Sequence, residues 1–262
     1  MAYRLIAADI DGTLVTESGI VSPRNLHAIA RLRELGLTFM LVTGRGLYSM
    51  RPFLPLVLPE TLVVGFNGAV IARAGGEILS EQRLSAACSR RILELGWNLA
   101  PAMVVWNSDK MFANRRDADI DRYQELSGMR AELVDRETLE QIPASKIIWF
   151  DSSGGVGKIL GALQEADTTG FDYFTSHAHF IEFVASGVSK GNALKKVGGL
   201  LGIDREEILA VGDGMNDLTM LEYAGLGVAM GNASPTLKAA ADYVTGAVEE
   251  DGFAQAIEKF VG

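Results

Sequence analysis

The hydrophobic positions of residues 1–81 fall into short, continuous runs. The runs LIAADI, TFMLV and LVVGF, which start at Leu5, Thr38 and Leu62, are apolar at nearly every position. A run of this length and composition is typical of a strand that is buried on both faces. These three runs therefore predict three buried strands.

A helix is predicted between the first two strands. Ser22 and Pro23 are a good N-cap and first-turn pair. Apolar residues then recur at helical spacing as far as Leu35, and Gly36 stands where a helix commonly ends. Further on, the runs AVIAR and EILSE flank Gly75–Gly76, which predicts a small β-hairpin.

Residues 187–262 show the same alternation of helical and strand patterns. The predicted helices are SKGNALKKVGGLLG, NDLTMLEYA, SPTLKAAA and FAQAIEKFV, and the predicted strands between them are EEILAVGD, GVAM and YVT. Strands that alternate with helices and are apolar throughout indicate a parallel sheet covered on both faces. The fold class predicted for 1–81 and 187–262 is therefore a doubly wound, Rossmann-like α/β core.

Residues 82–186 have a different pattern. Strand-like runs follow one another directly here, as in AMVVWN and KMFAN or FDYFTS and HFIEFV, with KIIWFD between them. Helical patterns cover 86–96, 117–127 and 155–166. Adjacent strands favour antiparallel pairing, so this region is predicted to be an α+β domain inserted into the core.

The composition narrows the possible partners and compartment. The net charge of −9 argues against a nucleic-acid-binding protein, which usually has a basic face. Cys88 is the only cysteine, so no intramolecular disulfide can form, as is usual in a reducing cytosol. The apolar run after Met1 is too short for a signal peptide, and no stretch is apolar enough to span a bilayer. We expect a soluble, cytoplasmic protein that binds neither membranes nor nucleic acid.

Polar residues follow several of the predicted core strands. Asp9 and Asp11 are two apart and should point to the same side, where their charges would repel unless a cation lay between them. Ligands bind at the carboxyl ends of parallel strands, so the polar residues that follow four strands should share one edge. These residues are Asp9, Asp11, Thr43, Arg45, Asn67, Asp213, Asn216 and Asp217.

The acids at this edge predict a magnesium site. Asp9, Asp11 and Asp213 offer only oxygen ligands, which suit Mg²⁺. The three histidines and the single cysteine do not form a plausible zinc set. Two other phosphate motifs fail: SSGGVGKI lacks key residues of a P-loop, and GDGMND lacks the third glycine of a dinucleotide loop.

Four motifs, taken in order, resemble those of the haloacid dehalogenase-like superfamily, and in detail its Cof-type sugar-phosphatase branch with a type IIB cap. They are DIDGTL at 9–14, VTGR at 42–45, GVSKG at 187–191 and GDGMND at 212–217. NGA at 67–69, AMGNA at 229–233 and the tail 249–252 also resemble that branch. The resemblance covers the core, whereas 82–186 matches a cap in position and size and only loosely in sequence.

The resemblance implies a role for each residue at the predicted edge. Asp9 stands at the position of the nucleophile, Asp11 at that of the acid/base, and Asp213 at that of a metal ligand. Thr43 and Lys190 are implied to contact the phosphate, together with Gly44, Arg45, Asn67 and Asn216. Gly12, Gly212 and Asp217 are implied to support the site.

Several residues keep a second interpretation. Arg45 could form a structural ion pair, Asn67 could serve only its turn, and Asp217 could simply cap the following helix. Lys190 could be a surface residue, although its charge is unfavourable at a helix start. In the insert, His177, His179 and Glu182 are candidates for contact with a substrate.

The resemblance implies a Mg²⁺-dependent phosphatase of small phosphorylated metabolites, with sugar phosphates as the first candidates. Two alternatives stay open. One is a phosphatase for another organophosphate, such as pyridoxal phosphate, a nucleotide or phosphoglycolate. The other is a phospho-accepting or ligand-binding regulator without turnover, which would have no use for the acid/base carboxylate of Asp11. The sequence gives no indication of the oligomeric state.

Overall fold

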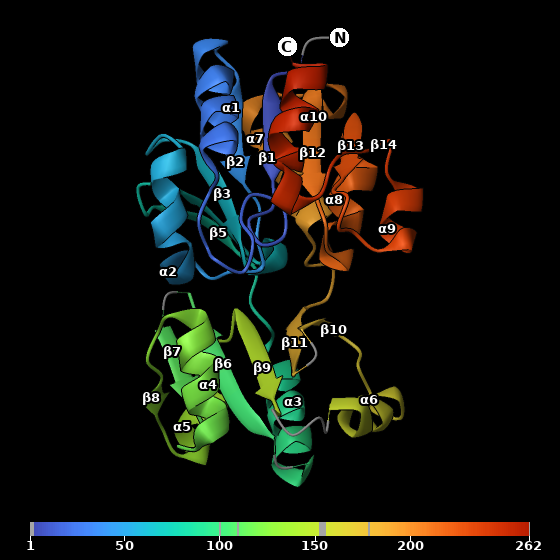
Figure 1. The fold of residues 1–262 in the computed structure, drawn as a ribbon. Helices are drawn as coiled ribbons and strands as arrows, with labels where there is room; N and C mark the ends of the chain where they lie inside the picture. Colours follow the sequence, from blue (N-terminus) through green and yellow to red (C-terminus); the bar gives the residue numbers. More distant parts are fainter. Residues whose placement is uncertain (1–2, 100, 109, 152–155, 178, 262) are drawn as a thin grey trace. The chain divides into compact units, whose positions relative to one another are not determined.

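The computed structural model describes residues 3–99, 101–108, 110–151, 156–177 and 179–261. The chain divides into two compact units (Figure 1). The first comprises Met1–Gly44, Arg51–Ser80 and Ser189–Gly262. The second comprises Arg45–Met50 and Glu81–Val188. The short segment Arg45–Met50, which the sequence pattern placed with the core, thus groups with the second unit.

The first unit is built on a five-stranded parallel sheet with the order β14-β13-β12-β1-β2. Its strands are β1 (Leu5–Ala8), β2 (Thr38–Leu41), β12 (Ile208–Gly212), β13 (Leu226–Ala229) and β14 (Tyr243–Val244). Every residue of β1 and β12 is buried, as continuous apolar runs predict. A parallel bridge between Val42 and Val64 places β3 (Leu62–Gly65) beside β2.

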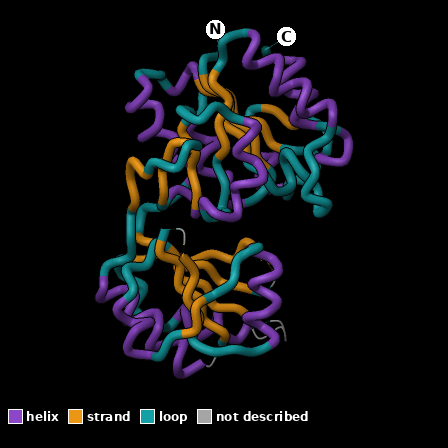
Figure 2. The backbone as a smooth tube through the Cα atoms, turned by 90° about the vertical axis from the view of Figure 1, so that its left-hand side faces the viewer, coloured by secondary structure: helices purple, strands orange, loops and turns teal. Residues whose placement is uncertain are grey.

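Helices cover both faces of this sheet (Figure 2). They are α1 (Pro23–Glu34), α7 (Lys190–Leu201), α8 (Leu218–Tyr223), α9 (Pro235–Ala240) and α10 (Gly252–Phe260). Leu5 and Ala7 face a buried cluster that contains Leu194 of α7 and Leu221 of α8. On the opposite face, α10 packs on α1, and the rings of Phe39 and Phe253 lie 5.7 Å apart. The predicted doubly wound parallel sheet is confirmed.

The predicted helix between β1 and β2 forms as expected, with Ser22 accepting a hydrogen bond from the Asn25 N–H as its N-cap. Its buried face differs in part from the apolar spacing. Ile29 and Leu32 are buried, whereas Leu26 and Leu35 are 44% and 40% exposed. Steps of three residues drift around a helix of 3.6 residues per turn, so a run of such steps leaves the buried face.

The predicted third strand ends earlier than its apolar run. It stops at Gly65, and Phe66–Gly68 forms a single 3₁₀ turn. The predicted hairpin follows as β4 (Val70–Arg73) and β5 (Ile78–Glu81), which complete a three-stranded sheet with β3.

The second unit contains a six-stranded sheet with the order β10-β11-β9-β6-β7-β8. Its strands are β6 (Ala102–Asn107), β7 (Lys110–Ala113), β8 (Glu132–Leu133), β9 (Lys146–Phe150), β10 (Phe171–His177) and β11 (Phe180–Ala185). All neighbouring strands pair antiparallel except β7 and β8, which are parallel. The predicted antiparallel arrangement of this region is therefore correct, apart from one short edge strand.

The helices of the second unit include three that the sequence predicted and two short ones that it did not. The predicted helices are α3 (Ala86–Leu99), α4 (Ala118–Ser127) and α6 (Val156–Gln164), and the missed ones are α2 (Leu47–Met50) and α5 (Arg136–Gln141). In α5 only Leu139 is buried, so no apolar period marks this helix in the sequence. No helix in the described part of the chain is long and apolar enough to cross a bilayer.

Candidate active site

The carboxyl ends of neighbouring strands bring the predicted residues of the first unit together. Asp9 follows β1 and donates its backbone N–H to the carbonyl of Val211 in β12 at 3.0 Å. Thr43, just beyond β2, donates its N–H to the Val64 carbonyl at 2.9 Å and accepts from the Asn67 N–H at 3.0 Å. Parallel pairing therefore fixes four loops at one edge, as the sequence predicted.

Lys190 lies at the centre of this edge and is fully buried. Its Nζ is 2.8 Å from Asp9 Oδ1 and 2.5 Å from Asp217 Oδ1. Burial alone would lower the pKa of Lys190, but the attraction of Asp217 and Asp9 outweighs it and raises that pKa. Lys190 is not a surface lysine: it is a fixed positive charge between two carboxylates.

Asp217 is buried and uses both of its oxygens. Oδ1 binds Lys190, while Oδ2 accepts the backbone N–H groups of Asp213 at 3.0 Å and Gly214 at 2.9 Å. The side chain makes no capping bond to α8. A methyl group at Gly212 would lie 2.5 Å from Asp217 Cβ, so a glycine is needed for this approach. Asp217 thus fixes the loop that carries Asp213.

The remaining acids leave the site with an excess of negative charge. Burial, followed by the charge of Asp217, raises the pKa of Asp213 to about 7, although a 3.0 Å hydrogen bond from Thr13 opposes the shift. Burial also raises the pKa of Asp9; Lys190 opposes this shift, and the neighbouring carboxylates add to it. The single positive charge of Lys190 does not balance the negative charges of Asp9, Asp213 and Asp217.

A hard divalent cation fits this donor set. Carboxylate oxygens of Asp9, Asp213 and Asp217 lie within 4.8 Å of one another. Because Asp217 already holds Lys190 and two amides, Asp9 and Asp213 are the members suited to a metal ion. Asp11 is exposed and is not part of this group, so its predicted role as a ligand stays a prediction.

The backbone conformation and the surroundings of Gly12 explain why a glycine follows Asp9 and Asp11. Its φ is +77°, in the left-handed region that favours glycine. A methyl group on Gly12 would lie 2.2 Å from Asp213 Oδ2. The first loop can therefore approach the carboxylate of the fourth motif only through a residue without a side chain.

The predicted phosphate contacts Asn67 and Asn216 are joined to each other. Asn216 donates its amide to Asn67 Oδ1 at 2.9 Å. Asn67 is buried in a left-handed conformation, with φ +56°, and Phe66 before it has φ +50°. Two such residues in succession cost about 1–3 kcal/mol each, and strain of this kind is concentrated at functional sites. A methyl group at Gly44 would lie 3.0 Å from Asn67 Oδ1, so Gly44 also belongs to this packing.

Comparison with known proteins agrees with this geometry. A family model described as haloacid dehalogenase-like hydrolase matches residues 6–257. The chain belongs to this family. It is 31% identical to the HMP-PP phosphatase of Citrobacter koseri, over 89% of the chain and 86% of that protein. The predicted superfamily is thereby confirmed, and the chain is an enzyme, a phosphatase of the haloacid dehalogenase-like family.

Solved structures of the haloacid dehalogenase-like family share the fold along the whole chain. A hydrolase of this family from Bacteroides thetaiotaomicron is 29% identical, with a TM-score of 0.87 over 98% of this chain and 99% of its own. A subclass IIB sugar phosphatase gives a TM-score of 0.84 over 98% and 99% of the two chains. At 22% identity this second likeness concerns the fold alone.

Not every predicted residue lies in the first unit of this phosphatase. Arg45 groups with the second unit, where its guanidinium donates to the Ser49 carbonyl at 3.3 Å. Glu182 is buried in the sheet of the second unit and pairs with Lys146 at 3.0 Å. His179 is partly buried in the turn just before β11, and the side chain of His177 lies outside the described residues.

Sequence reasoning missed two side chains at the site. Thr13 donates to Asp213 Oδ1, and Asn232 donates to the Gly12 carbonyl at 2.9 Å. Both stand inside quoted motifs, DIDGTL and AMGNA, but no role was assigned to either. Their contacts join loops that are far apart in the chain, so only the position within a motif could have indicated them.

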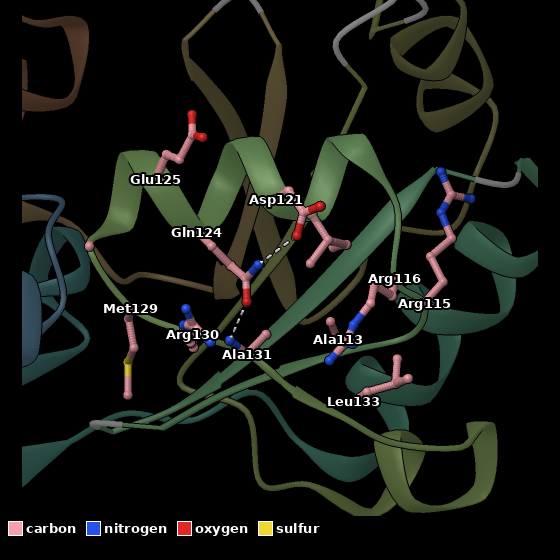
Figure 3. Close-up of a pocket in the computed structure, with 12 residues that line it drawn as sticks. Ala113, Arg115, Arg116, Asp121, Gln124, Glu125, Met129, Arg130, Ala131 and Leu133 are labelled. Atoms are coloured by element: carbon pink, nitrogen blue, oxygen red, sulfur yellow. Dashed lines mark hydrogen bonds between the residues drawn. The ribbon is translucent and has the colours of Figure 1, made fainter.

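The second unit has a cavity of its own (Figure 3). It lies between α4 and the strands β7 and β8, and its volume is about 750 Å³. Arg115, Arg116 and Arg130 line it together with Asp121 and Glu125. Gln124 links Asp121 to the Ala131 N–H across the cavity wall, as Figure 3 shows. The cavity contains none of the predicted site residues.

Proposed function

We propose that the chain is a Mg²⁺-dependent phosphatase that hydrolyses small phosphorylated metabolites through an aspartyl-phosphate intermediate. The observation that carries the proposal is the position of Asp9. It is a buried carboxylate held at 2.8 Å by a buried lysine, beside a second carboxylate at the carboxyl edge of a parallel sheet. A structural role alone would not require so many like charges in one buried place.

In the first step an Asp9 oxygen attacks phosphorus, and the bond between phosphorus and the leaving oxygen breaks. Asp11 gives its proton to the leaving alkoxide, which departs as an alcohol. The exposed position of Asp11, two residues along the same loop, suits exchange of protons with substrate and water. Positioned proton transfer of this kind contributes about 10²–10⁴-fold to the rate.

In the second step a water molecule attacks the aspartyl-phosphate. Asp11, now ionised, takes the proton from that water, and Asp9 is released as a carboxylate together with inorganic phosphate. Lys190 stays ion-paired with Asp9 through both steps, and its positive charge balances the negative charge on the phosphoryl oxygens. Thr43 and the linked pair Asn67–Asn216 are the other donors proposed for these oxygens.

Asp9 and Asp213, with Asp11 as the third predicted ligand, are the residues that would hold Mg²⁺. A bound Mg²⁺ would supply positive charge that keeps Asp9 and Asp213 ionised and stabilises developing charge on the phosphoryl group. Burial and the neighbouring carboxylates raise the pKa values of Asp9 and Asp213, and a cation at this edge would oppose both shifts.

Sugar phosphates are the first substrate class to test, because the motifs resemble the Cof-type sugar-phosphatase branch. The second class is another organophosphate, and one observation favours including it. The relative with 31% identity is named an HMP-PP phosphatase, so HMP-PP belongs in the substrate panel with pyridoxal phosphate, nucleotides and phosphoglycolate.

The test is phosphate release from this panel, measured with Mg²⁺ and with EDTA. Wild type is compared with Asp9→Asn, which removes the nucleophile at nearly constant shape. We expect release to require Mg²⁺ and to fall by at least about 10³-fold in Asp9→Asn. Glu222→Gln removes one carboxylate charge from an exposed position of α8 and should keep the wild-type rate.

Release that persists in EDTA or in Asp9→Asn would contradict the proposed mechanism. If a folded wild-type protein binds Mg²⁺ and releases phosphate from no substrate, the hydrolase proposal fails and a phospho-accepting regulator takes its place. If release is observed, the order of rates among the substrates of the panel identifies what the cap selects.

A further inference from the structure

Asn232 makes contacts that join three separate segments of the first unit. It belongs to the segment AMGNA after β13. Its Nδ2 donates to the Gly12 carbonyl at 2.9 Å and lies 3.4 Å from Asp213 Oδ2. Its Oδ1 accepts the Val248 N–H at 2.9 Å. One side chain thus connects the loop of the predicted nucleophile, a predicted metal ligand and the turn near the C-terminus.

The partners fix the orientation of this amide. A backbone N–H can only donate, so the atom facing Val248 must be the oxygen. A carbonyl and a carboxylate can only accept, so the atom facing Gly12 and Asp213 must be the nitrogen. The amide of Asn232 therefore presents its donor side to the site and its acceptor side to the turn Val248–Glu250.

We propose that Asn232 is a positioning residue for the metal site, which it supports from outside the set of ligands. It holds the Gly12 carbonyl, and so the loop that carries Asp9 and Asp11, against the carboxylate of Asp213. The turn Val248–Glu250 is its anchor. This proposal rests on the proposed Mg²⁺ site and gives a role to the segment AMGNA and to the tail near Glu250.

A purely structural role for Asn232 would be to hold the C-terminal turn, and Gln255 provides the comparison. Gln255 in α10 donates its side-chain amide to the Glu250 carbonyl at 2.6 Å. It therefore binds the same turn as Asn232. No contact of Gln255 with Gly12 or Asp213 is found among the described residues. Removal of either amide should loosen the turn, but only Asn232 also touches the metal site.

The experiment measures Mg²⁺ binding directly, by isothermal titration calorimetry on the full-length metal-free protein. Groups that orient metal ligands typically change the affinity by 10–100-fold when they are removed. We expect Asn232→Ala to weaken Mg²⁺ binding by about tenfold. Gln255→Ala should stay within about twofold of wild type. The hydroxyl of Asn232→Ser is too short to reach both Gly12 and Val248, so this variant should bind Mg²⁺ as weakly as Asn232→Ala does. It keeps the test valid if Asn232→Ala does not fold.

Phosphate release gives a second readout. In Asn232→Ala the Mg²⁺ concentration for half-maximal rate should rise by about tenfold, and the rate at saturating Mg²⁺ should stay near that of wild type. Wild-type Mg²⁺ affinity in both Asn232 variants would overturn the proposal, and so would an equal loss in Gln255→Ala. If wild type itself binds no Mg²⁺, the proposed function fails. That outcome differs from unchanged Mg²⁺ affinity in the Asn232 variants, which overturns only the role of Asn232.

Discussion

Gly12 sets the distance between two loops because it has no side chain. The Gly12 backbone is left-handed, and the Asp213 carboxylate occupies the space that a methyl group would need, 2.2 Å away. Gly19, in the same connection, is also left-handed, with φ +69°, but nothing lies within 4 Å of a methyl group there. Both positions therefore require a left-handed backbone, but only Gly12 has another residue, Asp213, in the space that a methyl group would need.

We expect Gly12→Ala and Gly19→Ala to have different effects on the metal site. Each forces alanine into the left-handed region, which costs about 1–2 kcal/mol. Gly12→Ala must in addition displace Asp213, so it should weaken Mg²⁺ binding by about tenfold or more. Urea unfolding measures the first effect and calorimetry the second. Equal Mg²⁺ affinity in the two variants would mean that the close approach to Asp213 has no functional weight.

At the scale of elements, Gly96 allows α3 to pack closely on the sheet of the second unit. A methyl group on Gly96 would lie 2.2 Å from Met103 Sδ in β6 and 3.0 Å from Trp149 Nε1 in β9. Gly161 is the counterpart in α6, where a methyl group would meet nothing within 4 Å. Glycine in a helix normally costs about 0.5–1 kcal/mol relative to alanine. At Gly96, close packing offsets this cost.

We therefore predict opposite effects of two glycine-to-alanine substitutions in helices of the second unit. Gly161→Ala should stabilise this unit by about 0.5–1 kcal/mol. Gly96→Ala should destabilise it by about 1–3 kcal/mol through overpacking. All three tryptophans of the chain, Trp97, Trp106 and Trp149, lie in the second unit, so their fluorescence during urea unfolding reports on it selectively.

Mg²⁺ affinity is the control for this comparison, because the predicted ligands lie in the first unit. Both variants should bind Mg²⁺ as wild type does. A stabilising Gly96→Ala would contradict the close packing of α3 on β6 and β9.

At the scale of the whole molecule, the buried acids make stability depend on pH and on Mg²⁺. The pKa of Asp213 is about 7 in the folded protein and 3.8 for the unperturbed group. Between these values the folded protein binds more protons than the unfolded chain, so the free energy of unfolding falls as pH rises. The raised pKa of Asp9 acts in the same direction. Groups with lowered pKa values, such as Asp167 and Glu258, act only at more acidic pH.

In EDTA, the melting temperature should therefore fall from pH 5 to pH 7 and level off above about pH 8, with at most about 1.4 kcal/mol lost per pH unit for each group. Mg²⁺ binds the ionised carboxylates, so the rise in melting temperature that it causes should grow with pH. Thermal melting followed by circular dichroism measures both effects. Asp213→Asn removes one of the two titrating groups and should make the fall in EDTA less steep; an unchanged curve would assign the dependence to other groups.

The sequence by itself determined the architecture and most of the residues that lie at the carboxyl edge of the parallel sheet. Continuous apolar runs gave the buried strands of the first unit, since a strand covered by helices on both faces has no polar positions. The acids Asp9 and Asp213 could be placed at one edge because parallel strands all end there, whatever the packing behind them. Capping residues fixed helix starts, as at Ser22, because a cap is a local contact.

Tertiary structure decided everything that depends on contacts between distant segments. The ion pairs of Lys190 join α7 to the loops after β1 and β12, and the three contacts of Asn232 join segments up to 220 residues apart. The sequence carries the residue types for these contacts but not the distances. Short polar helices such as α5 also escaped prediction, since they are held by a neighbouring element rather than by an apolar period of their own.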